Sequence, residues 1–134
     1  MRGTALNSKG PHFGTSALEG KKFIYDIIRY FGPKNGLDIG CGSGTYARLF
    51  PELNWTGVEI WEPYVDRFSL DRLYERFILA DARKWNPDDT YDIAIAGDVL
   101  EHMTCDEAAR VVNKLQECAK LTVISIPEIG RAHV

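Results

Sequence analysis

Apolar residues along this chain follow two patterns that alternate from one end to the other. Helical spacing is clearest in residues 16–31 and 105–119, where apolar side chains mark one face and charged residues mostly fall elsewhere. Short apolar runs bounded by glycine, proline or polar residues are typical of strands. The predicted helices are 16–31, 43–50, 63–74 and 105–119, with a turn or short helix at 82–85, and the predicted strands are 36–39, 55–60, 76–79, 91–96 and 121–126.

Strands that alternate with helices of this length imply βαβ crossovers, and therefore a parallel sheet with helices on both faces. We expect an α/β fold with a doubly wound, mostly parallel sheet of about five strands in the order 3-2-1-4-5. The first residues are polar, rich in glycine and without periodicity. We therefore expect a flexible N-terminal arm at 1–15 and one domain at 16–134.

The composition is that of an ordinary globular domain, with 45% apolar and 26% charged residues among 134. The net charge of −3 argues against nucleic-acid binding, because phosphate contacts need a basic face. No apolar run approaches the roughly 20 residues that cross a bilayer, and no signal-peptide segment opens the sequence, so we expect no membrane contact and a cytoplasmic protein. The three cysteines lack C-x-x-C spacing and the three histidines lack ligand spacing, so neither a disulfide framework nor a metal site is expected.

A glycine-rich turn follows the first predicted strand. Gly40, Gly42 and Gly44 let the backbone bend tightly and approach a ligand without interference from a Cβ atom, which favours a nucleotide-like ligand. Glu59 ends the next predicted strand and follows Gly40 by 19 positions (59 − 40). At about this spacing, folds of this type place an acid that binds the ribose hydroxyls.

Asp38 stands two residues before the first glycine and distinguishes two classes of ligand. A dinucleotide places its pyrophosphate at the glycine turn, where a neighbouring carboxylate would repel it. S-Adenosylmethionine has no phosphate, and an acid suits its ammonium and sulfonium charges. The third glycine also comes one residue earlier than in the dinucleotide motif. The pattern favours S-adenosylmethionine over NAD, with a structural hydrogen-bond acceptor as the alternative role of Asp38.

Four stretches in chain order resemble the motifs of the class I S-adenosylmethionine-dependent methyltransferases. They are LDIGCGSGTYARLF at 37–50, GVEI at 57–60, LADARKW at 79–85 and YDIAIAGDVLEHM at 91–103. The last stretch looks most like the small-molecule branch, which includes quinone and other metabolite methyltransferases. The motifs for methylation of exocyclic base amines and of cytosine C5 are absent from the sequence, so we expect a small-molecule acceptor.

The resemblance implies S-adenosyl-L-methionine as cofactor, with S-adenosyl-L-homocysteine as product, and assigns a set of cofactor-binding residues. The assigned residues are Asp38, Gly40, Cys41, Gly42 and Gly44 on the methionine side, Glu59 at the ribose, Ile60 and Ala82 on the two faces of the adenine, Asp81 as acceptor for its amine, and Gly97 and Asp98 after the fourth strand. An acid followed by alanine at a strand end also leaves room for a flat base and an acceptor for its amino group.

Glu101 and His102 follow the fourth strand and are the candidates for catalysis. Methyl transfer depends largely on holding the acceptor in line with the methyl group, and a base is needed only if the nucleophile starts protonated. His102 is the candidate base, and Glu101 can orient an acceptor. A role for this pair in shaping the cofactor pocket stays open. So do two other functions, a binding module that does not catalyse and an NAD-dependent oxidoreductase.

The sequence departs from the resembling family at its C-terminal end. The usual class I sheet has two further strands, so the chain looks truncated after the fifth. The apolar run LTVISI at 121–126 would then be an exposed edge of the kind that proteins normally cover. We expect this edge to pair with a second copy in a homodimer or with another partner.

Overall fold

The computed structural model describes residues 15–126, so the predicted arm at 1–15 lies almost wholly outside the described residues. The helices are α1 (Thr15–Phe31), α2 (Thr45–Leu49), α3 (Pro63–Phe68), α4 (Leu70–Leu73) and α5 (Cys105–Cys118), with a short 3-10 helix η2 (Leu100–His102). The strands are β1 (Asn35–Ile39), β2 (Asn54–Glu59), β3 (Arg76–Leu79), β4 (Tyr91–Gly97) and β5 (Ala119–Ser125). Within the described part of the chain, no helix is long and apolar enough to cross a membrane.

The strands form one five-stranded sheet in the order β3-β2-β1-β4-β5, and all neighbours pair in parallel. This confirms the predicted fold class and strand order. β1 lies at the centre, where Asp38 is in register with Gly57 of β2 and with Ile95 of β4. Because the strands are parallel, the turns that follow β1 to β4 all meet at one edge of the sheet.

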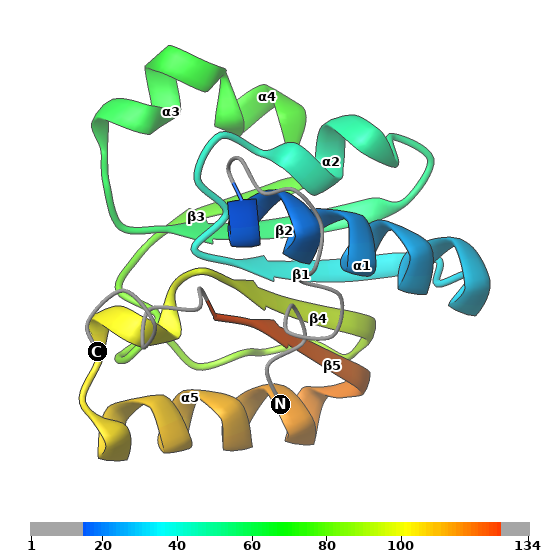
Figure 1. Ribbon diagram of the computed structural model, residues 1–134. Helices are drawn as coiled ribbons and strands as arrows, with labels where there is room; N and C mark the ends of the chain where they lie inside the picture. Colours follow the sequence, from blue (N-terminus) through cyan, green and yellow to red (C-terminus); the bar gives the residue numbers. More distant parts are fainter. Residues whose placement is uncertain (1–14, 127–134) are drawn as a thin grey trace.

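Helices cover both faces of the sheet, and the side chains of β4 show which face is which. Ile93 and Ile95 belong to the apolar cluster beneath α1, α2 and α4, whereas Ala94 and Ala96 belong to the cluster beneath α5. Figure 1 shows α5 on the opposite side of the sheet from α1 and α2. The alternation follows from the strand, in which successive side chains point to opposite faces.

Two predicted helices differ from the structure by more than one residue. The stretch 63–74 is broken into α3 and α4 at Ser69, whose φ of 53° is left-handed. Apolar spacing alone cannot reveal such a break. The helix predicted from residue 43 begins only at Thr45, because Gly44 before it has a φ of 83°. α5 passes directly into β5, which starts two residues earlier than predicted.

Large aromatic side chains lie flat on the glycines of the central strands. A Cβ atom on Gly57 would lie 2.6 Å from the ring of Tyr74, and one on Gly36 would lie 2.5 Å from the ring of Trp55. Both rings are buried, and Trp55 also donates from its indole nitrogen to the carbonyl of Phe50 at 2.9 Å. The glycines therefore allow these rings to pack closely against the sheet on the face that α1 covers.

We expect Gly57→Ala to destabilise the fold by about 1 to 3 kcal/mol, because the added methyl group collides with a ring that cannot move freely. Gly97→Ala is the matched control, since its added Cβ would find its nearest neighbour at 3.9 Å, and we expect a change within about 1 kcal/mol. Urea unfolding of both variants measures the two effects. Equal stabilities would show that the Tyr74 ring is not held against the strand.

Candidate functional site

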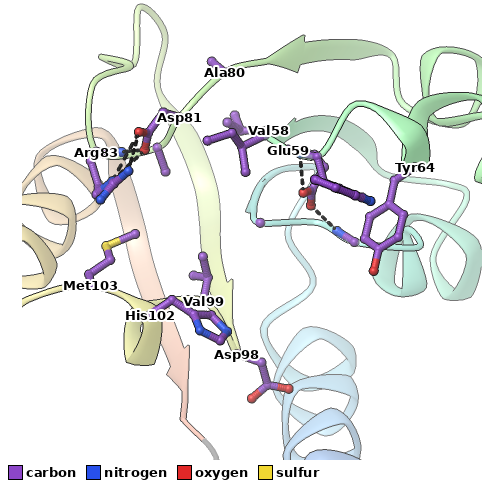
Figure 2. Close-up of a pocket in the computed structure, with 15 residues that line it drawn as sticks. Val58, Glu59, Tyr64, Ala80, Asp81, Arg83, Asp98, Val99, His102 and Met103 are labelled. Carbon is purple, nitrogen blue, oxygen red and sulfur yellow. Dashed lines mark hydrogen bonds and ion pairs between the residues drawn. The ribbon is translucent and has the colours of Figure 1, made fainter.

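A cavity of about 520 Å³ opens at the carboxyl ends of the strands. Figure 2 shows its lining side chains, with Asp81 and Arg83 on one side, Glu59 and Tyr64 on the other, and His102 and Asp98 nearer β4. The lining residues are Gly40 and Gly42 after β1, Val58 to Trp61 at the end of β2 and just beyond it, Tyr64 in α3, Ala80 to Arg83 after β3, and Asp98, Val99, His102 and Met103 after β4. The site is therefore built from turns that follow successive parallel strands.

The glycine turn is held against the end of β2. The backbone nitrogens of Gly40 and Cys41 both donate to the carbonyl of Val58, at 2.8 and 3.1 Å. Gly42 has a φ of 56°, and a Cβ atom there would meet nothing within 4 Å, so its backbone faces open space in the cavity. Gly44 differs, because a Cβ atom there would collide with the side chain of Leu73 of α4. Gly42 thus faces the cavity, and Gly44 serves helix packing.

The carboxylate of Glu59 joins the turns after β1 and β2. Its Oε1 accepts from the backbone nitrogen of Gly42 at 2.8 Å, and its Oε2 accepts from that of Trp61 at 2.9 Å. The residue is only 7% exposed, yet it lines the cavity. Since each carboxylate oxygen has two acceptor positions, both oxygens can still accept a hydrogen bond from a ligand.

Asp38 lies beneath the glycine turn and does not line the cavity. Its Oδ2 accepts from the Tyr74 hydroxyl at 2.7 Å, and the residue is 2% exposed. Burial raises the pKa of the Asp38 carboxyl to about 7; the Tyr74 hydroxyl opposes this rise, Glu59 adds to it and Lys21 opposes it. The alternation in β1 explains this position, because Leu37 and Ile39 face α5 while Asp38 faces the helices of the other side.

The Asp81 carboxylate is held by an arginine from the same turn. Arg83 donates to it from its backbone nitrogen at 2.9 Å and from its guanidinium at 2.8 to 3.2 Å. The hydrogen bonds from the Arg83 side chain lower the pKa of Asp81 to about 2. Ile60 and Ala82 also line the cavity, and Ile60 is 58% exposed.

The turn after β4 brings two acids and a histidine together. Asp98 has a left-handed backbone with a φ of 58°, and its buried Oδ1 has no hydrogen-bond partner among residues 15–126. Burial raises the pKa of Asp98, while the positive charge of Lys21 and a charged His102 act against this. Glu101 places its Oε2 3.4 Å from Nε2 of His102, whose side chain is 77% exposed.

The structure gathers eight of the thirteen predicted site residues around one cavity: Gly40, Gly42, Glu59, Ile60, Asp81, Ala82, Asp98 and His102. The other five predicted residues do not line the cavity: Asp38, Cys41, Gly44, Gly97 and Glu101. Sequence reasoning missed the cavity residues Arg83, Tyr64 and Met103, and the buried partner Tyr74. Of these, only Arg83 could have been proposed from the sequence, because it is a cation two positions after a predicted site acid.

Comparison with known protein families identifies the class to which this fold and cavity belong. The family described as "Methyltransferase domain" matches residues 37–121, which is more than half of the chain. The chain therefore belongs to this methyltransferase domain family. A comparison with curated protein sequences finds no match.

Solved structures, two of them described as methyltransferases, share the fold. The N-methyltransferase NodS from Bradyrhizobium japonicum, solved with S-adenosyl-L-homocysteine, aligns with a TM-score of 0.61 at 15% identity, over 75% of this chain and 56% of its own. The amino pentose methyltransferase CalS10 from Micromonospora echinaspora, solved with bound S-adenosylmethionine, gives 0.62 at 22% identity, over 89% and 53%. TehB from Haemophilus influenzae gives 0.66 at 18% identity, over 75% and 38%. The chain spans about half the length of these structures or less.

We expect Asp38→Asn to change how stability depends on pH, because asparagine keeps an acceptor oxygen for Tyr74 but cannot ionise. A carboxyl whose folded pKa is raised to about 7 contributes stability that is fully present below its unfolded pKa and is lost as the pH rises through about 7. At about 1.4 kcal/mol for each pKa unit, the full loss is roughly 4 kcal/mol. The free energy of unfolding of the variant minus that of the wild type should therefore rise between about pH 4 and about pH 8.

Denaturant unfolding at a series of pH values measures this difference. Asp26→Asn, which alters an exposed acid on α1, is the control, and its difference should stay within about 0.5 kcal/mol over the same range. A difference for Asp38→Asn that is equally flat would mean that the carboxyl is ionised in the folded chain at no cost.

Proposed function

We propose that the cavity binds S-adenosyl-L-methionine and that the protein transfers its methyl group to a small-molecule acceptor. One observation carries the proposal: each of the four strands whose turns meet at the cavity has an acid within two residues of its carboxyl end. Glu59, Asp81 and Asp98 line the cavity, and Asp38 is buried beneath the glycine turn. Such a rim favours a cationic ligand and disfavours a phosphate.

The residues present fit an adenosyl ligand. Gly42 allows close approach of the ligand to the backbone, and the free acceptor positions of Glu59 suit the two ribose hydroxyls. Ile60 and Ala82 offer apolar surfaces for a flat base, with Asp81 near them as an acceptor for its amine. NodS and CalS10, which were solved with such ligands, support the same assignment.

A dinucleotide is the poorer candidate, because its pyrophosphate would lie at the glycine turn. There the Gly42 nitrogen, which could bind a phosphate, already donates to the Glu59 carboxylate. A phosphate would have to displace a buried carboxylate or lie against its negative charge.

The cofactor would supply a methyl group on a cationic sulfur, which is already activated toward a nucleophile. The protein then has to hold the acceptor in line, and it needs a base only for an acceptor that starts protonated. His102 lines the cavity with an exposed ring, so its imidazole can take that proton. Small amines and sugars are the first acceptors to try, since NodS is an N-methyltransferase and CalS10 acts on an amino pentose.

We expect Glu59→Ala to weaken binding of S-adenosyl-L-homocysteine by about tenfold to a hundredfold, because at least one charged hydrogen bond to the ribose is lost. Isothermal titration calorimetry measures the affinity. Glu62→Ala, three positions later on an exposed part of the same turn, should change it by less than about twofold. Unchanged affinity in Glu59→Ala would remove this carboxylate from the site.

His102→Ala separates catalysis from binding. We expect its affinity for S-adenosyl-L-homocysteine to stay within about twofold of the wild type, while methyl release to a protonated acceptor falls by about a hundredfold or more. The assay follows methyl release over a panel of small amines, sugars and phenols. If the wild-type chain binds the cofactor but transfers to none of them, the non-catalytic binding module becomes the better interpretation.

A further inference from the structure

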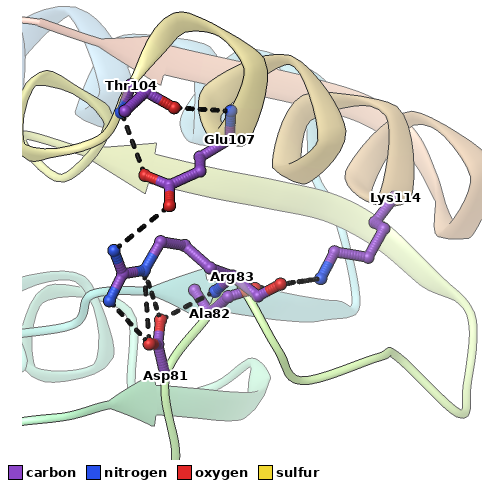
Figure 3. Close-up of polar contacts among 6 residues, drawn as sticks. All are labelled: Asp81, Ala82, Arg83, Thr104, Glu107 and Lys114. Atoms are coloured by element: carbon purple, nitrogen blue, oxygen red, sulfur yellow. Dashed lines mark hydrogen bonds and ion pairs between the residues drawn. The ribbon is translucent and has the colours of Figure 1, made fainter.

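Arg83 connects the turn after β3 with the start of α5, and it also lines the cavity. Its guanidinium pairs with the Asp81 carboxylate on one side, and its Nη1 lies 3.5 Å from Oε2 of Glu107 on the other (Figure 3). The arginine is therefore held between two carboxylates from different elements. Neither the family motifs nor the roles assigned so far require a cation at this position.

The hydrogen bonds of Asp81 leave it little freedom to accept others. Oδ1 accepts from the backbone nitrogen of Arg83 at 2.9 Å and from Nε at 3.0 Å. Oδ2 accepts from Nη2 at 2.8 Å, with a longer contact to Nε at 3.2 Å. A carboxylate has about four acceptor positions, two on each oxygen. Oδ1 is therefore filled, and Oδ2 keeps one position for a further donor.

Glu107 is itself fixed, because it completes the N-terminal cap of α5. Its Oε1 accepts from the backbone nitrogen of Thr104 at 3.0 Å, and its own backbone nitrogen donates to the Thr104 hydroxyl at 3.2 Å. Lys114, further along α5, donates to the carbonyls of Ala82 at 3.0 Å and Trp85 at 2.6 Å. α5 thus holds the turn that carries Asp81 and Arg83 at two points, as Figure 3 shows.

We propose that Arg83 is a positioning residue, which fixes Asp81 as a single, ionised acceptor and so makes the site select a 6-aminopurine over a 6-oxopurine. This inference rests on the proposed function, since it concerns the adenine end of the same cavity. An adenine amine can donate to the one open position of Oδ2. The oxygen of a 6-oxopurine is an acceptor, so it would face the carboxylate without a proton between them.

Two changes in Asp81 would weaken the preference for a 6-aminopurine, and the guanidinium prevents both. Asp81 cannot rotate away, because the fork of Arg83 holds both oxygens. It cannot take up a proton and become a donor, because the ion pair keeps it ionised. A free carboxylate at the same place could do either, or could accept from water in place of the ligand.

The test compares the affinities of S-adenosyl-L-homocysteine and S-inosyl-L-homocysteine, which differ at position 6 of the purine. We expect the wild type to prefer the adenosyl ligand by about tenfold to a hundredfold, since the wrong group leaves the Asp81 carboxylate facing an acceptor. Arg83→Ala should reduce this preference by about tenfold, and Arg83→Lys, which keeps the charge but not the fork, should lie between. Calorimetry gives both dissociation constants on one folded preparation, so a merely structural role would lower both affinities and leave their ratio unchanged.

Three further variants make the outcome specific. Asp81→Asn should abolish the preference, because an amide can rotate to donate to the oxo group. Glu107→Gln keeps an acceptor for Thr104 but loses the charge that anchors Arg83, and should give an intermediate ratio. Arg110→Ala, on an exposed part of α5, should leave the ratio unchanged.

An unchanged or larger preference in Arg83→Ala overturns the inference, as does an unchanged preference in Asp81→Asn. In both cases the proposed function survives if the wild type binds the adenosyl ligand and Glu59→Ala weakens that binding. A wild-type chain that binds neither ligand overturns the proposed function and the inference together.

Discussion

The bond network of one carboxylate determines the shape of the cavity. Glu59 receives a backbone hydrogen bond from each of two turns, one after β1 and one after β2, and so fixes them relative to each other. Neither turn has a helix or strand of its own at that point, and the left-handed glycines would otherwise give the first turn many conformations. An acid at the end of β2 therefore holds the two turns of the cavity in one arrangement. Each of the two oxygens keeps one acceptor position that the turns do not use.

A second acid, Asp38, lies beneath the glycine turn, where burial makes its ionised form unfavourable. Asp38 must face the α1 side of the sheet, because β1 alternates and its neighbours Leu37 and Ile39 face α5. An ionised carboxyl there has one hydrogen bond, from Tyr74, and almost no contact with water. Such a group is costly when charged, which is why its pKa rises. The Tyr74 ring that caps it also lies on Gly57, so the same side chain ties α4 to the centre of the sheet.

Much of the fold could be predicted from the sequence, because parallel strands buried on both faces appear as short apolar runs between helical stretches. The glycines and strand-end acids were also predicted, since spacing along the chain places them at one edge of the sheet. The break at Ser69 was not predicted, because a single left-handed residue leaves the apolar spacing almost unchanged. The burial of Asp38 and its bond to Tyr74 depend on which face of β1 meets α4. The pairing of Arg83 with Asp81 and Glu107 depends on side-chain geometry that no spacing rule contains.

The acids at the strand ends have different partners, so the two ends of the cavity differ in their electrostatic surroundings. Arg83 pairs with Asp81, so the carboxylate at the β3 end of the cavity has a cationic side chain beside it. Glu59 is bonded only to neutral backbone donors, and the buried Oδ1 of Asp98 has no partner among the described residues. The lining acids that receive no hydrogen bond from a cationic side chain therefore follow β2 and β4, on either side of the glycine turn. A ligand with a neutral aromatic base at one end and cationic groups at the other would match this arrangement best with its base beside Asp81, because the reverse orientation would place the cations beside a guanidinium.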